Sequence, residues 1–323
     1  MTSSHSVDIL DSGFVFKTAN TAEFNEKLKT EVQQIQALHG IYPKLMVPVL
    51  HTGLVGGRHF YILEKKSGAS LASLVFDATK SIEYRNQIIK HALDSIKTAV
   101  KIECNQPIDS TYQLHQKIRY EWDSLKQLHS LFDKPVIIEG KIIIPSGRAV
   151  VERALAYAEE EIFLASSTSA HCNFHFGNVL YDETLNEISF IDPDGSVQGI
   201  DPYFGFSRFA FSFWHELAAE IRDSINIVPL EKSILFLMKH DQHRQMLDQI
   251  PVIRSIHEIS NWIGEENYRK FYALTTYCFL RSMRINGSKD TWMMPSSPRA
   301  GTPEETLYAG LMFYLESLSS TVQ

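Results

Sequence analysis

The stretch Ser-Ala-His-Cys-Asn-Phe-His-Phe-Gly-Asn-Val-Leu-Tyr-Asp at residues 169–182, with Ile-Ser-Phe-Ile-Asp-Pro-Asp-Gly at residues 188–195, decides the interpretation of the chain. The apolar segments Val179 to Tyr181 and Ile188 to Ile191 predict two short strands joined by a turn at residues 182–187. Such a hairpin places Asn178 before its first strand and Asp192 after its second strand. We therefore expect these two side chains at the same end of the hairpin.

The two polar side chains at this end are suitable ligands for a divalent cation. Mg²⁺ sites of the substrate-phosphate type take one or two protein ligands, while phosphates and water supply the others. A carboxylate and an amide oxygen are ligands of this kind. Asn178 and Asp192 are therefore the candidate Mg²⁺ ligands.

This stretch resembles the catalytic core of the aminoglycoside phosphotransferase and choline kinase group, whose members are relatives of the protein kinases. In that group a loop His-x-Asp-x-x-x-x-Asn supplies a base and a metal ligand, and a later Ile-Asp-x-x-Gly supplies the second ligand. His171, Asn178, Asp192 and Gly195 match, whereas Asn173 stands at the position of the catalytic aspartate. The resemblance implies an α+β, two-lobed protein-kinase-like fold, with a small antiparallel-sheet lobe that carries one helix and a larger, mainly helical lobe.

A helix predicted from Ala22 to His39 carries a carboxylate on its apolar side. Glu31 falls within the stripe formed by the helically spaced residues Phe24, Leu28, Val32, Ile35 and Leu38. Because an unpaired buried carboxylate is strongly penalised, Glu31 either reaches solvent at the edge of the stripe or has a cationic partner. The resemblance favours Lys17, because in the kinase small lobe a strand lysine pairs with a helix glutamate and contacts the nucleotide phosphates.

Short strands are predicted at Ser6–Leu10, Phe14–Thr18, Leu45–His51 and His59–Leu63. Residues 64–71, Glu-Lys-Lys-Ser-Gly-Ala-Ser-Leu, resemble the hinge of these kinases, whose backbone groups bind the adenine edge. The resemblance implies Glu64 and Lys66 as nucleotide-binding positions. It also divides the chain into an N-lobe of residues 1–66, truncated at its start, and a C-lobe of residues 67–323 with the catalytic-loop hairpin and the acceptor region.

The chain departs from the group at two further places. Kinases have a glycine-rich loop between their first two strands. The strand predicted here at Ser6–Leu10 corresponds to the second of these, and only residues 1–5 precede it. Ser3, Ser4 and His5 are either the remnant of such a loop or a frayed terminus. Later, Asp201 and Pro202 match the group, but Gly205 stands where a second aspartate normally braces the catalytic loop. Because of these departures, the sequence does not predict how the phosphates are covered or how the catalytic loop is braced.

The large lobe is predicted to be mainly helical. The segment Ile285–Gly301 shows no periodicity and is long for a connection, so it is either a lid over an acceptor site or an ordinary surface loop. A capping box at residues 302–305 predicts a final helix. The other predicted elements are helices at Ser81–Ile102, Thr111–Leu131, Arg148–Ala165 and Phe206–Glu220, and a hairpin formed by Val136–Ile138 and Ile142–Ile144.

Composition limits the class of protein and its partners. A chain of 323 residues with 44% hydrophobic residues can bury a substantial core. Its formal charge of −7 argues against nucleic acid and anionic membrane as main partners. The 3 cysteines are too few for a disulfide framework, and no apolar stretch approaches the ~18 residues of a membrane span. We therefore expect a cytoplasmic protein.

The residues lead to two main functional hypotheses. The first is an ATP- or GTP-dependent phosphotransferase that uses Mg²⁺ and transfers a γ-phosphate to a hydroxyl of a small molecule, with Asn173, His175 and His171 at the catalytic loop. Its activity is expected to be weak, because Asn173 cannot accept a proton at neutral pH. The second is a pseudokinase, a nucleotide-binding or structural module whose partner is another protein. A metal site formed by His171 and His175 is a third reading, but it requires a helix, and Gly177 favours a loop.

Overall fold

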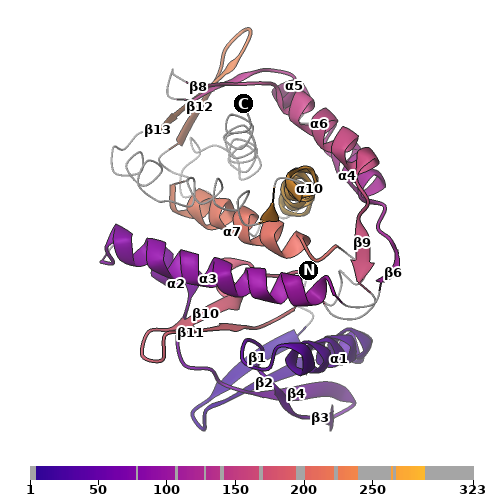
Figure 1. Cartoon of the computed structure of the whole chain (residues 1–323), viewed down its shortest axis with the longest axis vertical. Helices are drawn as coiled ribbons and strands as arrows, with labels where there is room; N and C mark the ends of the chain where they lie inside the picture. The colour runs from indigo at the N-terminus through magenta and orange to yellow at the C-terminus, as the bar shows by residue number, and fades with distance from the viewer. Residues whose placement is uncertain are drawn as a thin grey trace. The chain divides into compact units, whose positions relative to one another are not determined.

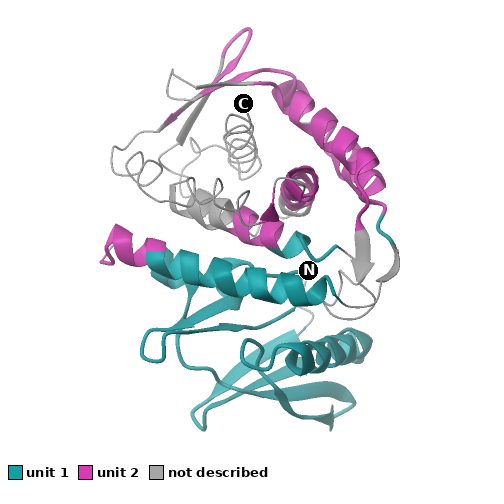
Figure 2. Ribbon diagram, in the orientation of Figure 1, with its two compact units in different colours: residues 1–77, 87–112, 164–205 teal, residues 78–86, 113–163, 206–323 magenta. Residues whose placement is uncertain are grey.

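The computed structural model describes residues 5–77, 79–105, 108–126, 129–138, 142–166, 170–193, 201–221, 225–238, 263–264 and 267–287 (Figure 1). The chain forms two compact units, which Figure 2 distinguishes: residues 1–77, 87–112 and 164–205, and residues 78–86, 113–163 and 206–323. The first unit takes in segments on both sides of residue 66. The lobe boundary drawn there stays a prediction.

The first unit is built on a four-stranded antiparallel sheet of order β1-β2-β4-β3. β1 and β2 are joined by a turn in which Gly13 has a φ of 84°, a conformation that glycine adopts without strain. Lys17 of β2 lies opposite Val7 on one side and Tyr61 on the other. The strands are β1 (His5–Leu10), β2 (Phe14–Ala19), β3 (Val49–Val55) and β4 (Arg58–Glu64).

All four predicted strands are present, although the third is shifted along the chain. β3 runs from Val49 to Val55, whereas the sequence predicted a strand from Leu45 to His51. Pro48 has no N–H group to donate to a strand ladder, which explains the later start. The carbonyl of Leu45 instead accepts a hydrogen bond from the N–H of Phe190 at 2.6 Å.

The predicted first helix is α1 (Asn25–Ile41), preceded by a 3₁₀ turn at Ala22–Phe24. Its buried side consists of Leu28, Val32, Ile35 and Leu38, and Glu31 and Gln34 are buried beside them. Burial of these four aliphatic side chains fixes the helix by the hydrophobic effect, at roughly 1.5–3 kcal/mol for each fully buried side chain. The same packing brings Glu31 into the interior of the unit.

The hairpin predicted around the decisive stretch is present as β10 (Val179–Asp182) and β11 (Glu187–Phe190). It forms a three-stranded sheet with the short β5 (Ala69–Ser70), which leads into α2 (Leu71–Val75). Gly68 precedes β5 with a φ of 106°, and a Cβ there would lie 2.5 Å from the carbonyl oxygen of Tyr181. Only glycine allows this approach of the hinge segment to the hairpin.

α3 (Ile82–Glu103) confirms the predicted helix at residues 81–102. Beyond it, two predicted helices have different bounds. Residues 111–131 are not one helix: β6 (Ile108–Thr111) is followed by α4 (Leu114–Asp123) and α5 (His129–Phe132). The helix predicted to reach Ala165 is α6 (Gly147–Glu160), and β9 (Leu164–Ser166) follows it. Three consecutive glutamates at residues 159–161 oppose the dipole at a helix end, and the apolar residues after them pair with β6.

The second unit contains α4, α5, α6 and α10 (Tyr268–Gly287), and most of α7 (Phe204–Ile221). α10 packs against α6 and α4, and Arg284 of α10 pairs with the buried Glu121 of α4. The predicted hairpin is present as β7 (Val136–Ile138) and β8 (Ile142–Ile144). It extends into a four-stranded sheet with β12 (Ile225–Pro229) and β13 (Ile234–Met238), a hairpin that the sequence analysis missed.

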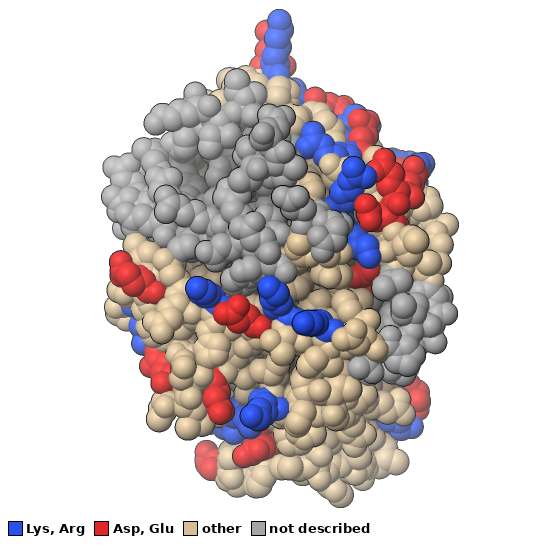
Figure 3. All heavy atoms as spheres, in the orientation of Figure 1, with Lys and Arg blue, Asp and Glu red and all other residues tan. Residues whose placement is uncertain are grey.

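Several sequence-based expectations fall outside the described residues: Ser3 and Ser4, Gly195, and the final helix from residue 302. Residues 285–287 of the proposed lid belong to α10, and its remainder lies outside as well. Among the described residues, no helix is both long and apolar enough to cross a membrane. On the face drawn in Figure 3, basic and acidic side chains are interspersed.

Candidate nucleotide site

The centre of the candidate site is Lys17, which contacts two carboxylates. Its Nζ lies 2.6 Å from Oε1 of Glu31 and 2.6 Å from Oδ1 of Asp192. The predicted ion pair between Lys17 and Glu31 is therefore confirmed. The hydroxyl of Tyr61, opposite Lys17 on β4, donates to the same oxygen of Glu31 at 2.5 Å. One cation and one phenol thus hold Glu31 on the buried side of α1.

Exposure differs sharply among these groups. The side chains of Lys17 and Glu31 are 6% and 7% exposed, whereas that of Asp192 is 45% exposed. Buried ion pairs are retained where both partners are present and further hydrogen bonds satisfy them. Lys17 and Glu31 form such a pair, and Asp192 is the member that a ligand can reach.

The pKa values follow from burial and from the shared lysine. Burial works to lower the pKa of Lys17, but Asp192 and Glu31 raise it above its ordinary value. Burial works to raise the pKa of Asp192, and Lys17 brings it below its ordinary value. Burial, with Asp192 nearby, raises the pKa of Glu31 despite Lys17. Lys17 and Asp192 therefore keep their charges at neutral pH.

The two asparagines of the loop both hold the backbone of Asp192. The side-chain nitrogen of Asn173 donates to the carbonyl oxygen of Asp192 at 2.8 Å, and that of Asn178 donates to the same oxygen at 3.1 Å. Asn178 also donates to the carbonyl of Asn173 at 3.2 Å. Asp192 has a φ of 52°, in the left-handed region. The N-x-x-x-x-N spacing thus provides two amide donors for one carbonyl at the end of the hairpin.

The donor groups at this end agree with the chemistry of Mg²⁺. Both hydrogen bonds of Asn178 use its nitrogen, so its amide oxygen is the end that remains for a cation. The partly exposed carboxylate of Asp192 is the second hard oxygen ligand. Among the described residues, no group of three or more His, Cys, Asp or Glu side chains is placed to hold a metal ion. The residues present therefore fit a cation whose other ligands come from phosphate and water.

His171 is completely buried and stacks on Phe174, with ring centroids 4.5 Å apart. Its Nδ1 accepts the N–H of Asn173 at 3.3 Å, and burial lowers its pKa to about 3. The ring is therefore neutral, and it supports the loop through this hydrogen bond and through its stacking on Phe174.

His175 also contacts its own loop, because its Nδ1 accepts the N–H of Gly177 at 3.1 Å and caps the 3₁₀ turn Phe176–Asn178. Residues 170–175 are not helical, so the metal-pair reading has no structural support.

Glu103 at the end of α3 supports the loop, and its role was not predicted from the sequence. Its Oε1 accepts the hydroxyl of Tyr42 at 2.8 Å and the backbone N–H of His171 at 2.9 Å. Glu103 is 1% exposed, and burial raises its pKa to about 8. A signal was available, because Leu93, Ile96 and Val100 form an apolar stripe along this helix and Glu103 lies three residues after Val100. Tyr61 was also missed, since its place opposite Lys17 depends on strand register.

The hinge positions lie at the end of the sheet. Glu64 is the exposed last residue of β4, opposite Phe14, and the N–H of Lys65 donates to the carbonyl of Gly13 at 2.9 Å. Ser67 then donates a hydrogen bond to Asp182 of the hairpin. The contact of Glu64 and Lys66 with a nucleotide base stays a prediction.

The absence of a bracing aspartate at residue 205 has a steric explanation. Asp201 is 1% exposed and accepts the N–H of Tyr203 at 3.0 Å, close to the start of α7. A Cβ at Gly205 would lie 2.7 Å from the ring of Phe174. The ring of Phe174 therefore occupies the space that a side chain at residue 205 requires.

Comparison with known proteins supports the same fold. No protein-family model matches the sequence, and no curated protein sequence matches it. Among solved structures, a mutant of aminoglycoside 2'-phosphotransferase IIIa in complex with GDP is similar over 100% of this chain and 90% of that protein, with a TM-score of 0.50 and 13% identity. The aminoglycoside phosphotransferase APH(3'')-Id from Streptomyces rimosus, in complex with ADP and streptomycin, matches over 84% of this chain and 91% of its own, with a TM-score of 0.45 and 14% identity.

The chain therefore has the protein-kinase-like fold of the aminoglycoside phosphotransferases, with an antiparallel sheet in its amino-terminal part and helices in its carboxy-terminal part. The fold predicted from the decisive stretch is confirmed.

Proposed function

We propose that this protein binds ATP or GTP with Mg²⁺ and transfers the γ-phosphate, slowly, to a hydroxyl group of a small molecule. The observation that carries the proposal is Lys17, held within 2.6 Å of both Glu31 and Asp192. A buried cation fixed next to a partly exposed carboxylate is the arrangement with which kinase-like enzymes neutralise nucleotide phosphates and hold their metal. Lys17 would contact the phosphates, and Asp192 and Asn178 would hold Mg²⁺, which supplies further charge neutralisation.

A surface for the base adjoins the lysine. Val7 lies opposite Lys17, and opposed residues of an antiparallel pair project from the same face of a sheet. Ile9 projects from that face as well, because side chains alternate along a strand. The two residues are 51% and 64% exposed. An apolar strand surface beside a fixed cation suits a molecule with a flat base at one end and phosphates at the other.

The transfer step is expected to be slow because of Asn173. Its amide nitrogen is used to hold the Asp192 carbonyl, and an amide cannot accept the hydroxyl proton at neutral pH. Loss of a general base typically reduces a rate by about 10²–10⁴-fold. Phosphoryl transfer depends mainly on positioning and charge stabilisation, so a reduced rate remains compatible with the site.

The hydrogen bond from Asn173 to the carbonyl of Asp192 also favours a second candidate function, the pseudokinase. If the loop exists to shape the Asp192 backbone, the protein binds a nucleotide and presents its surface to a protein partner without catalysis. The ring of Phe174 in place of a bracing side chain at residue 205 agrees with this alternative. The cytoplasmic location and the exclusion of nucleic acid and membrane as partners stay predictions from the sequence.

The test is thermal unfolding with ATP, GTP and ADP, each with and without Mg²⁺. A ligand at a hundred times its Kd stabilises the folded state by about 2.7 kcal/mol, which raises the melting temperature measurably. We expect a Mg²⁺-dependent shift that is lost in Asp192→Ala. Turnover is then measured with a panel of small molecules that carry hydroxyl groups.

Absence of a shift with every nucleotide would refute both functions as nucleotide binders. A Mg²⁺-dependent shift without turnover on any hydroxyl acceptor would favour the pseudokinase.

A further inference from the structure

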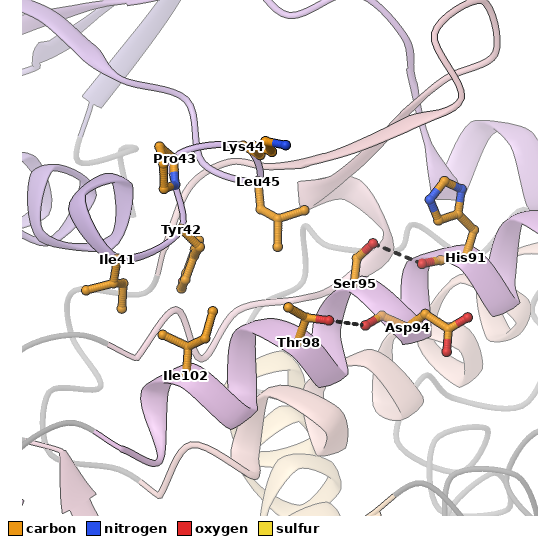
Figure 4. A pocket seen from close by; sticks show the side chains of 10 residues that line it. All are labelled: Ile41, Tyr42, Pro43, Lys44, Leu45, His91, Asp94, Ser95, Thr98 and Ile102. Carbon is orange, nitrogen blue, oxygen red and sulfur yellow. Dashed lines mark hydrogen bonds between the residues drawn. The ribbon is translucent and has the colours of Figure 1, made fainter.

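A cavity of about 530 Å³ that is open to solvent lies in the first unit, apart from the cluster around Lys17 (Figure 4). It is bounded by the connection that follows α1 and by one side of α3. Tyr42 and Leu45 reach toward the helix, and Thr98 and Ile102 reach toward the connection. Pockets of about 300–1,000 Å³ with mostly apolar walls are the usual sites of small molecules in proteins.

The chemistry of the walls selects an apolar ligand. Ile41, Tyr42, Leu45 and Ile102 supply hydrocarbon and aromatic surface. The hydroxyl groups of Ser95 and Thr98 donate to the carbonyls of His91 and Asp94 in their own helix, at 3.0 and 2.9 Å. These donors are used within α3, so that side of the wall does not require polar groups on the ligand. Charges stand at the exposed rim, on Lys44 and Asp94.

Two walls of the cavity are hydrogen-bonded to the candidate nucleotide site. The hydroxyl of Tyr42 donates to Glu103 at 2.8 Å, and the same oxygen of Glu103 accepts the N–H of His171, the first residue of the catalytic loop. Tyr42 is buried, at 4% exposure, and a displacement of its side chain would change the hydrogen bond to Glu103.

The second connection runs through the backbone. The carbonyl of Leu45 accepts the N–H of Phe190 at 2.6 Å, and Met46 forms a parallel bridge with Phe190. Phe190 ends β11, two residues before Asp192. A molecule that displaces the connection after α1 therefore acts on both the loop at His171 and the strand that leads to Asp192.

We propose that this cavity binds a small, mainly apolar molecule, and that its occupation changes the affinity of the nucleotide site through Tyr42, Glu103 and the backbone of His171. The coupling half of the proposal rests on the function proposed above. Coupling between two sites is reciprocal, so a nucleotide changes the affinity of the cavity by the same factor.

The binding half is tested with 1-anilinonaphthalene-8-sulfonate, whose fluorescence rises in apolar sites, as the probe. Thr98→Phe places a ring in the cavity, and Lys97→Phe places the same ring at an exposed neighbouring position of α3 outside it. We expect saturable binding of the probe to the wild type and to Lys97→Phe, and binding weaker by roughly tenfold or more in Thr98→Phe. Equal binding by all three proteins would overturn the proposal. If Thr98→Phe does not fold, Ser95→Leu fills the same wall.

The coupling half is tested by titrating Mg²⁺–ADP with and without saturating probe. We expect a change in Kd of about fivefold or more in the wild type, and a smaller change in Tyr42→Phe, which keeps the ring but lacks the hydroxyl. Hydrogen exchange at the amide of His171 provides a readout that needs no nucleotide, and it should change when the probe binds. Probe binding that alters neither would refute the coupling. A protein that binds the probe and alters exchange at His171 but binds no nucleotide would refute only the proposed function.

Discussion

The cluster at Lys17 and the residues that support the loop at His171 hold buried ionisable groups in opposite charge states. Both place ionisable groups in the interior of the first unit. At Lys17, opposite charges in contact keep Lys17 and Asp192 ionised. At Glu103 and His171, burial moves the two pKa values to about 8 and about 3, which favours the neutral form of each at neutral pH. The cluster that is proposed to contact phosphates is charged, and the loop at His171 is held by hydrogen bonds to neutral groups.

The largest effect is expected from removal of Lys17, the cation that Glu31 and Asp192 share. Lys17→Met leaves Glu31 and Asp192 without a counter-charge, and removal of one partner of a buried ion pair typically destabilises a protein by about 3–5 kcal/mol. We expect that loss in urea unfolding at pH 7, together with loss of nucleotide binding. The double variant Lys17→Met/Glu31→Leu should regain much of the stability and none of the binding. A single variant as stable as the wild type would show that the cluster is not held by charge.

The neutral state of Glu103 is tested by the pH dependence of the free energy of unfolding. The folded-state pKa of Glu103 is about 8, above its ordinary value of 4.5, so its contribution to stability is complete below pH 4.5 and is lost as pH rises toward 8. This upward shift in the pKa of Glu103 corresponds to a free energy on the order of 5 kcal/mol. Glu103→Gln keeps an acceptor for Tyr42 and for the N–H of His171 but does not titrate. We expect the stability of this variant, measured by denaturation from pH 4.5 to 8, to change less with pH than that of the wild type.

His171 should contribute the opposite slope. Its folded-state pKa of about 3 lies below its ordinary value of 6.5, so the folded protein binds fewer protons than the unfolded chain between these values. The stability contributed by the neutral ring is complete above pH 6.5 and falls as pH decreases toward 3. His171→Phe should remove this acid-side slope, whereas it should leave the slope between pH 6.5 and 8 intact. An unchanged acid limb would mean that His171 is solvated in the folded protein.

Asn173→Asp tests whether a charge can be introduced into the neutral loop. The variant loses the amide donor to the Asp192 carbonyl and places a carboxylate near that oxygen, which should lower stability by about 1–3 kcal/mol. If the proposed transferase is correct, turnover of Mg²⁺–ATP or Mg²⁺–GTP should nevertheless rise by roughly 10²–10⁴-fold. Asn173→Ala is the control, since it removes the donor without supplying a base. Lower stability without any gain in turnover would favour the pseudokinase.

The smallest expected effect concerns the packing beneath the loop. Gly205→Ala brings a methyl group against the ring of Phe174, and overpacking of this kind typically reduces stability by about 1–3 kcal/mol, partly offset by the better helix propensity of alanine. The double variant Phe174→Leu/Gly205→Ala should recover the loss in thermal unfolding. If the ring moves freely, Gly205→Ala alone will be neutral or stabilising.

The sequence predicted the contacts whose signals are local. Glu31 was identified because it interrupts an apolar stripe, and the hairpin carrying Asn178 and Asp192 was identified because its strands are adjacent in the chain. The pairing of β6 with β9 joins residues more than fifty positions apart, and no local pattern indicates it. The role of Glu103 required knowledge that the amide of His171 lies beside the end of α3. Short-range periodicity indicates which groups are buried, and tertiary structure decides what they contact.

The left-handed backbone of Asp192 also restricts which amino acids this position can accept. Asparagine and aspartate enter that region far more easily than other residues with a side chain, because their short polar groups make local hydrogen bonds. Glutamate would offer the same carboxylate with a longer reach, but it would strain the backbone whose carbonyl the two asparagines hold. The identity of the acid at residue 192 is therefore set twice, once by the ligand it would bind and once by the conformation of the chain.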